Sequence, residues 1–426
     1  GCEGQFLEIC VRNIDNHHRE NDASIQEWLW RFTMNEKIKS VPPEMKKPQQ
    51  GTLIGFVTAT LSFAVIYMAS AAPVPLFAIY RQTLDLTHSD LSYAAVAYFA
   101  GAVTALLMFA RISDHFGRRI VIFINLLLAM FGCLIFLDLA SSAMLLAGRF
   151  IQGFACGLAS SAVAAYVVDN ASLSPAWLGS VVTGAAPMLG LAGGSLASGA
   201  LRQYGSGSLS IIFVVIMAML MVCFVMLAFS PETVLRSQGG FRSLKPQIRI
   251  PLSIRPLLPA ACATFVGTWS IGGFYLPFSA SMAAEQLHTD NTFVAAAVFA
   301  CMMTPYLIGG SLAGRMKPVS AQRMGMVAFT LCMAGIIASL KLSSVSFFML
   351  ATVGAGIAWG IAFTGSMRTI LGNISKEDRA GVLSTVFLIS YSGAAIPNMF
   401  VGQLFRNTSL SYIATGYGIL VFLACF

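Results

Sequence analysis

Long apolar segments alternate with short polar ones from residue 52 onward. Twelve of them are long enough, at about 1.5 Å of rise per residue, to cross about 30 Å of hydrocarbon as helices. They cover residues 52–80, 91–109, 120–138, 143–168, 176–201, 209–229, 257–283, 291–314, 323–340, 345–371, 380–405 and 410–426. The pattern predicts an all-α membrane protein with twelve transmembrane helices. The last run is near the lower limit for a crossing, so we expect it to lack a few C-terminal residues.

The composition is typical of a membrane protein, and the sequence shows no pattern typical of a catalytic or metal-binding site. Hydrophobic residues make up 57% of the chain and charged residues 10%, whereas a soluble domain has about 25% charged residues. Most of the nine cysteines lie in apolar runs without metal-ligand spacing, and the chain has no Gly-x-x-x-x-Gly-Lys-[Ser/Thr] loop and no nucleophile beside a base. We therefore expect neither an enzyme nor an ATP-driven pump, and no cofactor or metal.

The basic residues are distributed unevenly between the two sides of the predicted membrane. With a cytoplasmic N-terminus, sixteen Lys and Arg residues after residue 44 fall on the inner side and four on the outer side. Since cytoplasmic loops carry the excess of Lys and Arg, both termini are predicted to be cytoplasmic, in a bacterial inner membrane. The net charge of +8 then reflects topology, and no nucleic-acid partner is expected.

Residues 1–44 differ from the rest of the chain because they are polar and begin with Gly1. Met45, followed by Lys46 and Lys47, is typical of the start of a membrane protein. One interpretation is that residues 1–44 are translated upstream DNA or another non-native leader. The other is a cytoplasmic tail in which residues 25–32 form an amphipathic helix.

A polar, basic segment at residues 231–256 divides the spans into an N-terminal half (45–230) and a C-terminal half (257–426). A shift of 200 residues places His88-Ser89-Asp90 on His288-Thr289-Asp290, and a shift of 203 places Gly190 on Gly393. Two related halves joined by a linker predict two pseudo-symmetric six-helix bundles with a cavity between them, which is a transporter architecture.

Residues 110–119 place four charges and a glycine in the short gap between the second and third spans. The charges must lie at a membrane surface, and an acid beside basic residues can bridge the ends of two helices. Asp114 and Arg118 are the expected pair.

On these residues the chain resembles a major facilitator superfamily (MFS) transporter from about residue 50 onward. The family's signature after the second span is Gly-x-x-x-Asp-[Arg/Lys]-x-Gly-[Arg/Lys]-[Arg/Lys], and residues 110–119 match its Asp, its Gly and its last two basic positions. The resemblance implies a conformational latch formed by Asp114, Gly117, Arg118 and Arg119. The alternative is a simple positively charged turn.

Arg149 lies within the fourth span. A lone guanidinium at such depth costs about 2.5–3.5 kcal/mol on insertion scales, so it should face a cavity or a polar partner. The segment is similar to the family's Arg-x-x-Gln-Gly signature in Arg149, Gln152 and Gly153, and the resemblance implies a role in proton coupling or substrate binding. The alternative is that Arg149 extends to the outer headgroups.

Glycines within the spans are candidates for close helix packing. The fifth span resembles the glycine-rich segment of exporters in the same family, although plain packing explains its glycines equally well. The predicted packing positions are Gly153, Gly157, Gly190, Gly194 and Gly393.

The remaining polar and aromatic residues inside the spans are candidates for a binding site. The first span contains no acid, and all acids after residue 44 lie near span ends or in loops, which disfavours a cationic cargo. Around a central cavity these residues would suit a neutral, amphipathic or anionic solute, with Arg149 as the counter-charge. The candidates are Tyr67, Tyr98, Asn125, Gln152, Trp269, Tyr275, Trp359, Tyr391 and Asn398.

Together these features predict a monomeric secondary transporter that moves a small solute by alternating access, driven by protons or another coupling ion. Proton-coupled efflux of an apolar or amphipathic compound is favoured over uptake of an organic anion. A hypothesis of another class is a non-transporting receptor or assembly factor on the same scaffold.

Overall fold

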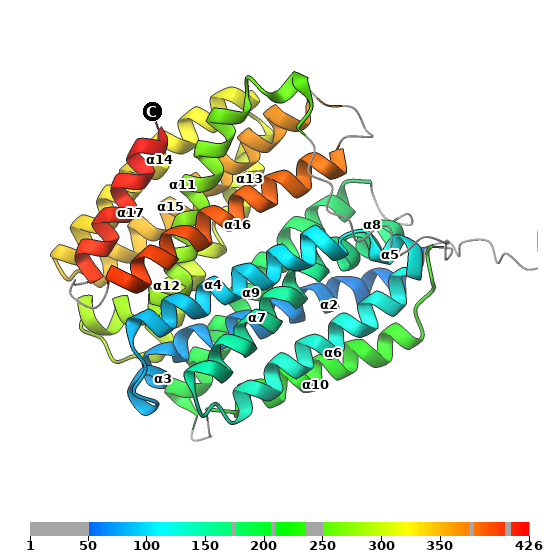
Figure 1. Cartoon of the computed structure of the whole chain (residues 1–426), viewed down its shortest axis with the longest axis horizontal. Helices are drawn as coiled ribbons and strands as arrows, with labels where there is room; N and C mark the ends of the chain where they lie inside the picture. The colour runs from blue at the N-terminus through cyan, green and yellow to red at the C-terminus, as the bar shows by residue number, and fades with distance from the viewer. Residues whose placement is uncertain are drawn as a thin grey trace, which may run out of the picture. The chain divides into compact units, whose positions relative to one another are not determined.

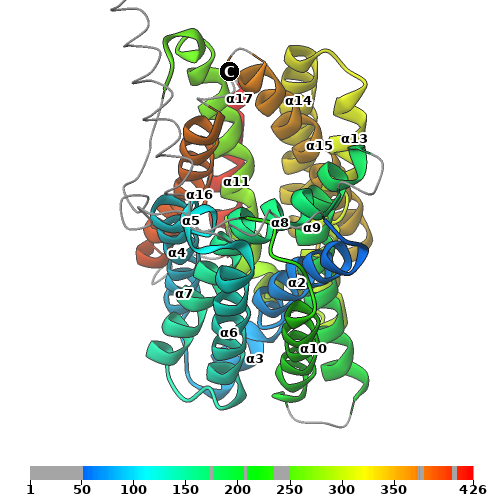
Figure 2. The same ribbon diagram turned by 90° about the vertical axis from the view of Figure 1, so that its right-hand side faces the viewer.

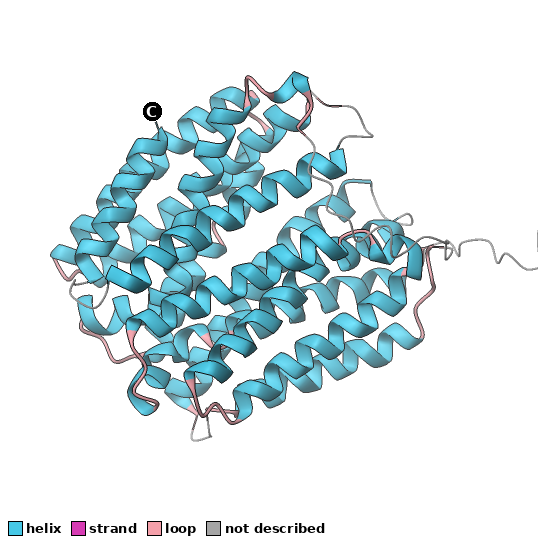
Figure 3. Ribbon diagram, viewed as in Figure 1, coloured by secondary structure: helices cyan, strands magenta, loops and turns pink. Residues whose placement is uncertain are grey.

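The computed structural model describes residues 51–171, 176–205, 209–234, 250–372, 374, 379–404 and 410–425. Within these ranges, helices joined by short loops account for all regular structure, and no strand occurs (Figure 3). The predicted all-α fold is therefore confirmed. The extension at residues 1–44 and residues 235–249 of the linker lie outside the described residues.

The N-terminal half contains the first six predicted spans. They comprise α2 (Leu53–Ala71) with η1 (Val74–Leu76) and α3 (Phe77–Thr83), α4 (His88–Thr104) with η2 (Ala105–Phe109), α6 (Arg118–Leu137), α7 (Ser142–Leu158) with η3 (Ala159–Val163) and α8 (Ala164–Asn170), α9 (Ala176–Tyr204) and α10 (Ile211–Ala228). The short helix α5 (Ile112–Phe116) forms the turn before α6.

The C-terminal half contains the other six spans, preceded by η6 (Leu252–Ile254). They comprise α11 (Leu258–Ser281) with η7 (Met282–Gln286), α12 (Thr292–Met303) with α13 (Tyr306–Gly314), α14 (Pro318–Lys341), α15 (Val345–Leu371), α16 (Arg379–Leu404) and α17 (Leu410–Cys425).

All twelve predicted segments are helical. Among the described residues, ten continuous helical runs are long and apolar enough to cross a membrane, and α11 and α17 are the other two. Two segments bend where the apolar pattern is continuous, one at Pro73 between α2 and η1 and one at Pro305 between α12 and α13. Proline explains both breaks because it lacks the N–H that continues a helix and clashes with the preceding turn.

Polar caps fix where several helices begin. The Thr52 side chain accepts a hydrogen bond from the N–H of Gly55, and Thr87 with Asp90 forms a capping box at α4. Asn291 caps α12. These side chains satisfy N–H groups that the first helical turn leaves unpaired.

The entry into α4 differs from the entry into α12. His88 is the first residue of α4, whereas His288 lies in the loop before α12 with a φ of 50°. Asp85, in the loop before α4, has the corresponding φ of 52°. The positive-φ residues of the two loops are 203 positions apart and the N-caps Thr87 and Asn291 are 204 apart, so the two histidines that match at a shift of 200 occupy different places relative to their helices.

The helices form two bundles, α2–α10 and α11–α17 (Figures 1 and 2). The bundles meet mainly along two helix pairs, α4 with α16 and α9 with α12. Ser92 on α4 donates to the backbone oxygen of Asn398 at 2.5 Å, and Ser195 on α9 donates to that of Ala296 at 3.2 Å. These bonds join the halves because each hydroxyl reaches a carbonyl of the opposite bundle.

Two ends of this helical body are distinguished below. The Arg118 end contains α5 and the first turn of α6, at the right in Figure 1. The Glu285 end contains α3, η7 and the start of α12. At the Glu285 end, the N–H of Thr292 donates to Oε1 of Gln203 at 3.0 Å, which adds another link between the bundles.

Candidate functional site

A cavity of about 300 Å³ lies between the bundles, and both halves of the chain line it. None of the described residues that line it is charged, and about half are aromatic. The lining residues are Phe63, Tyr67, Tyr98, Phe99, Ser160, Ala164, Thr183, Gly184, Pro187, Met188, Leu191, Trp269, Gly272, Leu276, Phe299, Met303, Tyr306, Trp359, Phe363, Phe387 and Tyr391. We call this space the central cavity.

Aromatic side chains of the C-terminal half form one wall of the central cavity. The Trp269 ring lies edge-on to Tyr391, with centroids 4.8 Å apart, and to Trp359, with centroids 6.0 Å apart. Tyr306 lies 5.7 Å from Trp359 in the same arrangement. Edge-to-face contacts of this kind hold each ring in place, so the wall is a preformed aromatic surface.

The N-terminal wall contains a pair of hydrogen-bonded hydroxyl groups. Tyr67 on α2 shares a hydrogen bond with Ser160 on η3, with their oxygens 2.6 Å apart, and its hydroxyl also donates to the backbone oxygen of Cys156 at 3.3 Å. Tyr67, Tyr98, Trp269, Trp359 and Tyr391 are the sequence-predicted candidates that lie on the cavity.

Arg149 and Gln152 do not line the central cavity. Arg149 is fully buried, and its Nη1 donates to the backbone oxygen of Ser70 at 2.6 Å and to Oε1 of Gln152 at 2.7 Å. Its guanidinium lies 4.5 Å from the centroid of the Tyr98 ring, and Gln152 donates to the backbone oxygen of Ala69 at 2.9 Å. Arg149 was expected to face either a cavity or a polar partner, and the structure shows polar partners. The Tyr98 ring lies between its guanidinium and the cavity, so Arg149 does not place a positive charge on the cavity surface.

Three other candidates also lie away from the central cavity. Asn125 is buried in α6, and neither its side-chain nitrogen nor its oxygen has a hydrogen-bond partner among the described residues. Asn398 donates to the backbone oxygen of Ala394 within α16, next to the contact with α4. Tyr275 bonds Thr352 inside the C-terminal bundle. These helices turn the predicted polar groups toward neighbouring helices.

The five predicted packing glycines all lie where a second helix approaches closely. A Cβ atom on any of them would overlap the backbone of the neighbouring helix. Gly153 and Gly157 face α4, Gly190 and Gly194 face α2, and Gly393 faces α11. The close approach of these helices thus depends on the absent side chains.

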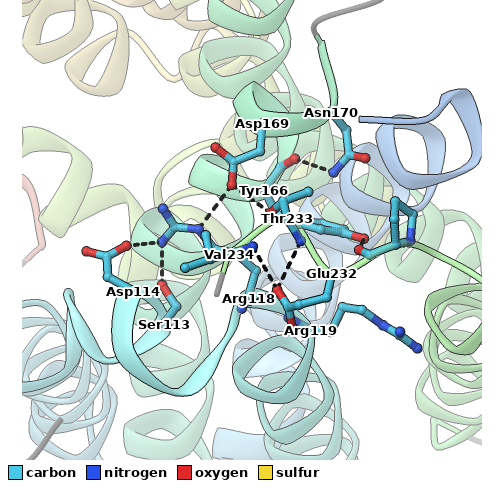
Figure 4. Close-up of polar contacts among 11 residues, drawn as sticks. Ser113, Asp114, Arg118, Arg119, Tyr166, Asp169, Asn170, Glu232, Thr233 and Val234 are labelled. Atoms are coloured by element: carbon cyan, nitrogen blue, oxygen red, sulfur yellow. Dashed lines mark hydrogen bonds and ion pairs between the residues drawn. The ribbon is translucent and has the colours of Figure 1, made fainter. Parts of the chain in front are cut away.

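Arg118 is the centre of a polar cluster at the Arg118 end (Figure 4). Its Nη1 lies 2.5 Å from Oδ1 of Asp114 and donates to Ser113 at 2.6 Å. Its Nε donates to Oδ2 of Asp169 at 3.2 Å, which also accepts from Thr233 at 2.8 Å. The predicted pair of Asp114 and Arg118 is therefore part of a larger network that joins the N-terminal bundle to the start of the linker.

Glu232 holds the first turn of α6. Its carboxylate accepts from the N–H of Arg118 at 2.9 Å and from that of Arg119 at 3.2 Å, an anion at a helix N-terminus. Gly117 has a φ of 99°, and a Cβ atom there would lie 2.7 Å from the carboxylate, so this turn requires glycine. The side chain of Arg119 points away to the backbone oxygen of Ala228 at 2.8 Å.

Sequence reasoning missed Asp169 and Glu232 as members of this cluster. The signal for Glu232 was its position directly after a strongly apolar span, but its partner lies more than a hundred residues earlier in the chain. Asp169, near the end of α8, gave the same signal, since it directly follows the predicted fourth span, but its partner Arg118 also lies far away in the sequence.

A second cavity, of about 280 Å³, lies at the Arg118 end. Asp114, Arg111 and Arg118 line it on one side, and Gly381 and Ser384 of α16 on the other. Ser160 and Phe387 line both this space and the central cavity. The two cavities are thus neighbours. We call the second cavity, which both charged and apolar residues line, the antechamber.

At the Glu285 end, ion pairs join the two bundles. Oε1 of Glu285 lies 2.7 Å from Nη2 of Arg81 and 3.2 Å from Nε2 of His88. Arg81 also bonds His88. Burial raises the pKa of Glu285, but His88 and Arg81 outweigh it and hold that pKa below its ordinary value.

The described residues contain no group of three or more His, Cys, Asp or Glu side chains that could hold a metal ion. The polar groups on the central cavity are side-chain hydroxyl groups and the indole N–H groups of Trp269 and Trp359, neither of which has a hydrogen-bond partner among the described residues.

Comparison with known proteins gives a family and a fold. A sequence model described as the Major Facilitator Superfamily matches residues 59–397. The multidrug resistance protein MdtL of Klebsiella pneumoniae is 36% identical over 76 residues, which make up 18% of this chain and 19% of that protein. MdtL of Salmonella paratyphi C is 31% identical over 99 residues, 22% of this chain and 25% of that protein. The matches thus span a quarter or less of these curated relatives.

Two solved structures share the fold over nearly their whole length. A point mutant of the nucleoside transporter NupG has a TM-score of 0.67 at 13% identity, covering 88% of this chain and 98% of that one. The xylose transporter XylE from E. coli, in a partially occluded inward open conformation, has a TM-score of 0.63 at 15% identity, covering 87% and 95%. At such identities the likeness concerns the fold alone.

Proposed function

Because the chain belongs to the Major Facilitator Superfamily and is therefore a multi-pass membrane transporter of small solutes, we propose that it exports a neutral, apolar or amphipathic compound by alternating access, coupled to protons. The observation that carries this proposal is the central cavity, whose described lining is aromatic and uncharged. Such a surface gains free energy by burying apolar area, and it offers hydroxyl groups and the indole N–H groups of Trp269 and Trp359 for orientation.

The cavity gives less support to an organic anion as cargo. An anion would need a cation in direct contact, because burying an unpaired charge is costly. Arg149 is the nearest candidate in the sequence, but Tyr98 separates its guanidinium from the cavity. We assign Arg149 a positioning role, holding α2 to α7 and supporting the Tyr98 ring from behind.

We further propose that the Arg118 end faces the cytoplasm and that this conformation is open toward it. The excess of Lys and Arg in the loops on that side supports the orientation. The antechamber beside Asp114 supports an open path, and the contacts of Arg81 and Gln203 with the other bundle support closure at the opposite end. The bacterial relatives named MdtL support placement in an inner membrane.

Coupling to protons requires a group that binds and releases them, and no described cavity residue is an acid or a histidine. We propose that the acids at the two ends of the helical body bind and release the coupling protons. Asp114 lies opposite the first turns of α16 across the antechamber, where closure would bring it toward a helix N-terminus, which favours negative charge. We propose that the transporter acts as a monomer, since one chain supplies the whole cavity.

Flux measured in proteoliposomes tests this proposal. The probe is dansyl-glucamine, a neutral amphipathic amide whose polyol slows passive crossing. Wild-type protein should accumulate it only with an imposed pH gradient, and collapsing the gradient with nigericin should stop accumulation. Arg149→Ala should sharply reduce flux because the Tyr98 wall loses its support. No flux of the probe in either direction would overturn the proposed cargo class, and a protein that binds the probe without moving it would favour a non-transporting protein on this scaffold.

A further inference from the structure

Helix α9 contributes five residues to the central cavity, and Gly184 is the one without a side chain. No heavy atom lies within 4 Å of the position that a Cβ atom on Gly184 would occupy. Gly184 is also solvent-accessible, with Thr183, Pro187 and Met188 around it on the same wall. The space beside Gly184 therefore belongs to the cavity.

Close packing explains three glycines farther along α9 but not Gly184, whereas a Cβ atom on Gly193 would meet only Cε of Met68, at 3.3 Å. A Cβ atom on Gly190 or Gly194 would overlap backbone atoms of α2, and one on Gly199 would lie 2.8 Å from the backbone oxygen of Thr292. Since glycine is a poor helix former compared with alanine, each of these positions has a steric reason to lack a side chain. At Gly184 no neighbouring helix supplies that reason.

The opposite wall contains a glycine of the other kind. A Cβ atom on Gly272 of α11 would lie 2.7 Å from Cη2 of Trp359, so the indole ring occupies the room that Gly272 leaves. Both glycines line the same cavity. Gly272 makes room for the indole ring of Trp359, whereas Gly184 leaves space that no protein atom fills.

We propose that Gly184 sets the upper size limit of the cargo, because the volume of its absent side chain is volume that the cargo uses. This inference rests on the function proposed above and adds a specificity-determining residue to it. Larger residues at this position would then narrow the cavity from the α9 wall while leaving the helix contacts of α9 unchanged. Compounds that fill the cavity would be excluded first, and small ones would still bind.

The experiment measures binding by energy transfer from Trp269 and Trp359 to a dansyl group, in a background with Trp28, Trp30 and Trp177 replaced by phenylalanine. Dansylamide is the small probe, and N,N-dibenzyl dansylamide is the bulky one. Wild-type protein is expected to bind both.

Gly184→Ala, Gly184→Leu and Gly184→Phe should weaken the bulky probe in that order. We expect at least about a tenfold rise in Kd for Gly184→Phe, while dansylamide changes by less than about threefold, because steric exclusion scales with the volume inserted. Gly184→Leu serves if the phenylalanine variant fails to fold. Gly314→Phe is the matched control, since a Cβ atom there also meets nothing within 4 Å but the residue lies off the cavity.

Unchanged affinity of the bulky probe in a folded Gly184→Phe or Gly184→Leu protein would overturn the inference. So would an equal loss of both probes with an unchanged unfolding temperature, because that result indicates a blocked site without size selection. Failure of wild-type protein to bind either probe has a different meaning: it would overturn the proposed cargo class and the inference together.

Discussion

The two ends of the helical body hold ion clusters of similar chemistry that connect different parts of the molecule. At the Arg118 end, Arg118 bonds Asp114 and Asp169, and all three belong to the N-terminal bundle. At the Glu285 end, Arg81 of the N-terminal bundle pairs with Glu285 of the C-terminal bundle. One cluster is internal to a bundle, whereas the other crosses between bundles.

Under the proposed alternating access, this difference separates a stabilising role for the Arg118 cluster from a conformational role for the Glu285 cluster. A cluster within one bundle survives a rigid movement of the bundles, so in the proposed alternating-access cycle Arg118 would hold the turn between α5 and α6 through Ser113 and Asp169 even when Asp114 binds a proton. In the same proposed cycle, a cluster between the bundles would exist only while its end is closed, so it would stabilise the closed state and not the open one. Arg81 and Glu285 are about a quarter to a third exposed, and exposed pairs contribute about 0–1 kcal/mol. The crossing cluster can therefore bias the equilibrium without locking it.

The largest expected effect is from Arg118→Ala. It removes contacts to Ser113, Asp114 and Asp169 together, and Arg118 is only 13% exposed, so we expect a loss of about 1–3 kcal/mol in the free energy of unfolding. Urea titration followed by circular dichroism measures it. Arg118→Lys should lose less, because one ammonium group replaces part of the network.

If the Arg118 cluster is confined to the N-terminal bundle, the Arg118→Ala variant should leave the Glu285 end closed. Spin labels at Gln82 and Asp290, in a cysteine-free background, report the separation of the bundles at the Glu285 end. A large widening of that distance in Arg118→Ala would contradict a cluster confined to one bundle.

A moderate effect is expected from reversing charge across the bundles. Glu285→Arg places like charges opposite Arg81, so the population open at the Glu285 end should rise up to about fivefold, the equivalent of about 1 kcal/mol. The double variant Arg81→Glu with Glu285→Arg should restore much of the wild-type distance distribution. Absence of any shift in the single variant, or of any recovery in the double variant, would show that the pair does not bias closure.

The smallest effect is expected from acidification. The pKa of Glu285 in the closed state lies below its ordinary value of 4.5, so the carboxylate favours closure fully at pH values above that ordinary value and loses this effect as the pH falls through the lowered pKa. The same spin-label pair, measured from pH 7 downward, should widen only in the acid range. Glu285→Gln should remove this dependence, and a wild-type transition unchanged in that variant would assign it to other groups.

The sequence by itself determined the number, length and approximate ends of the helices. A chain in hydrocarbon must satisfy every backbone N–H and C=O internally, so an apolar run of sufficient length has to be helical, and all twelve predicted runs are. The charged turn at residues 110–119 and the close-packing glycines such as Gly190 also follow from local chemistry. Where the pattern failed locally, as at Pro305, proline had already marked the break.

Only the tertiary structure decided which polar side chains face the cavity. Lipid and helix interfaces are both apolar, so the sequence of a transmembrane helix carries little asymmetry from which to infer its rotation. That rotation placed Tyr67 and Trp269 on the central cavity but turned Asn125 and Asn398 into helix interfaces. The partners of the charged groups could not be predicted from the sequence either. Glu232 contacts Arg118 only after the intervening spans have packed and brought two distant loops to one surface.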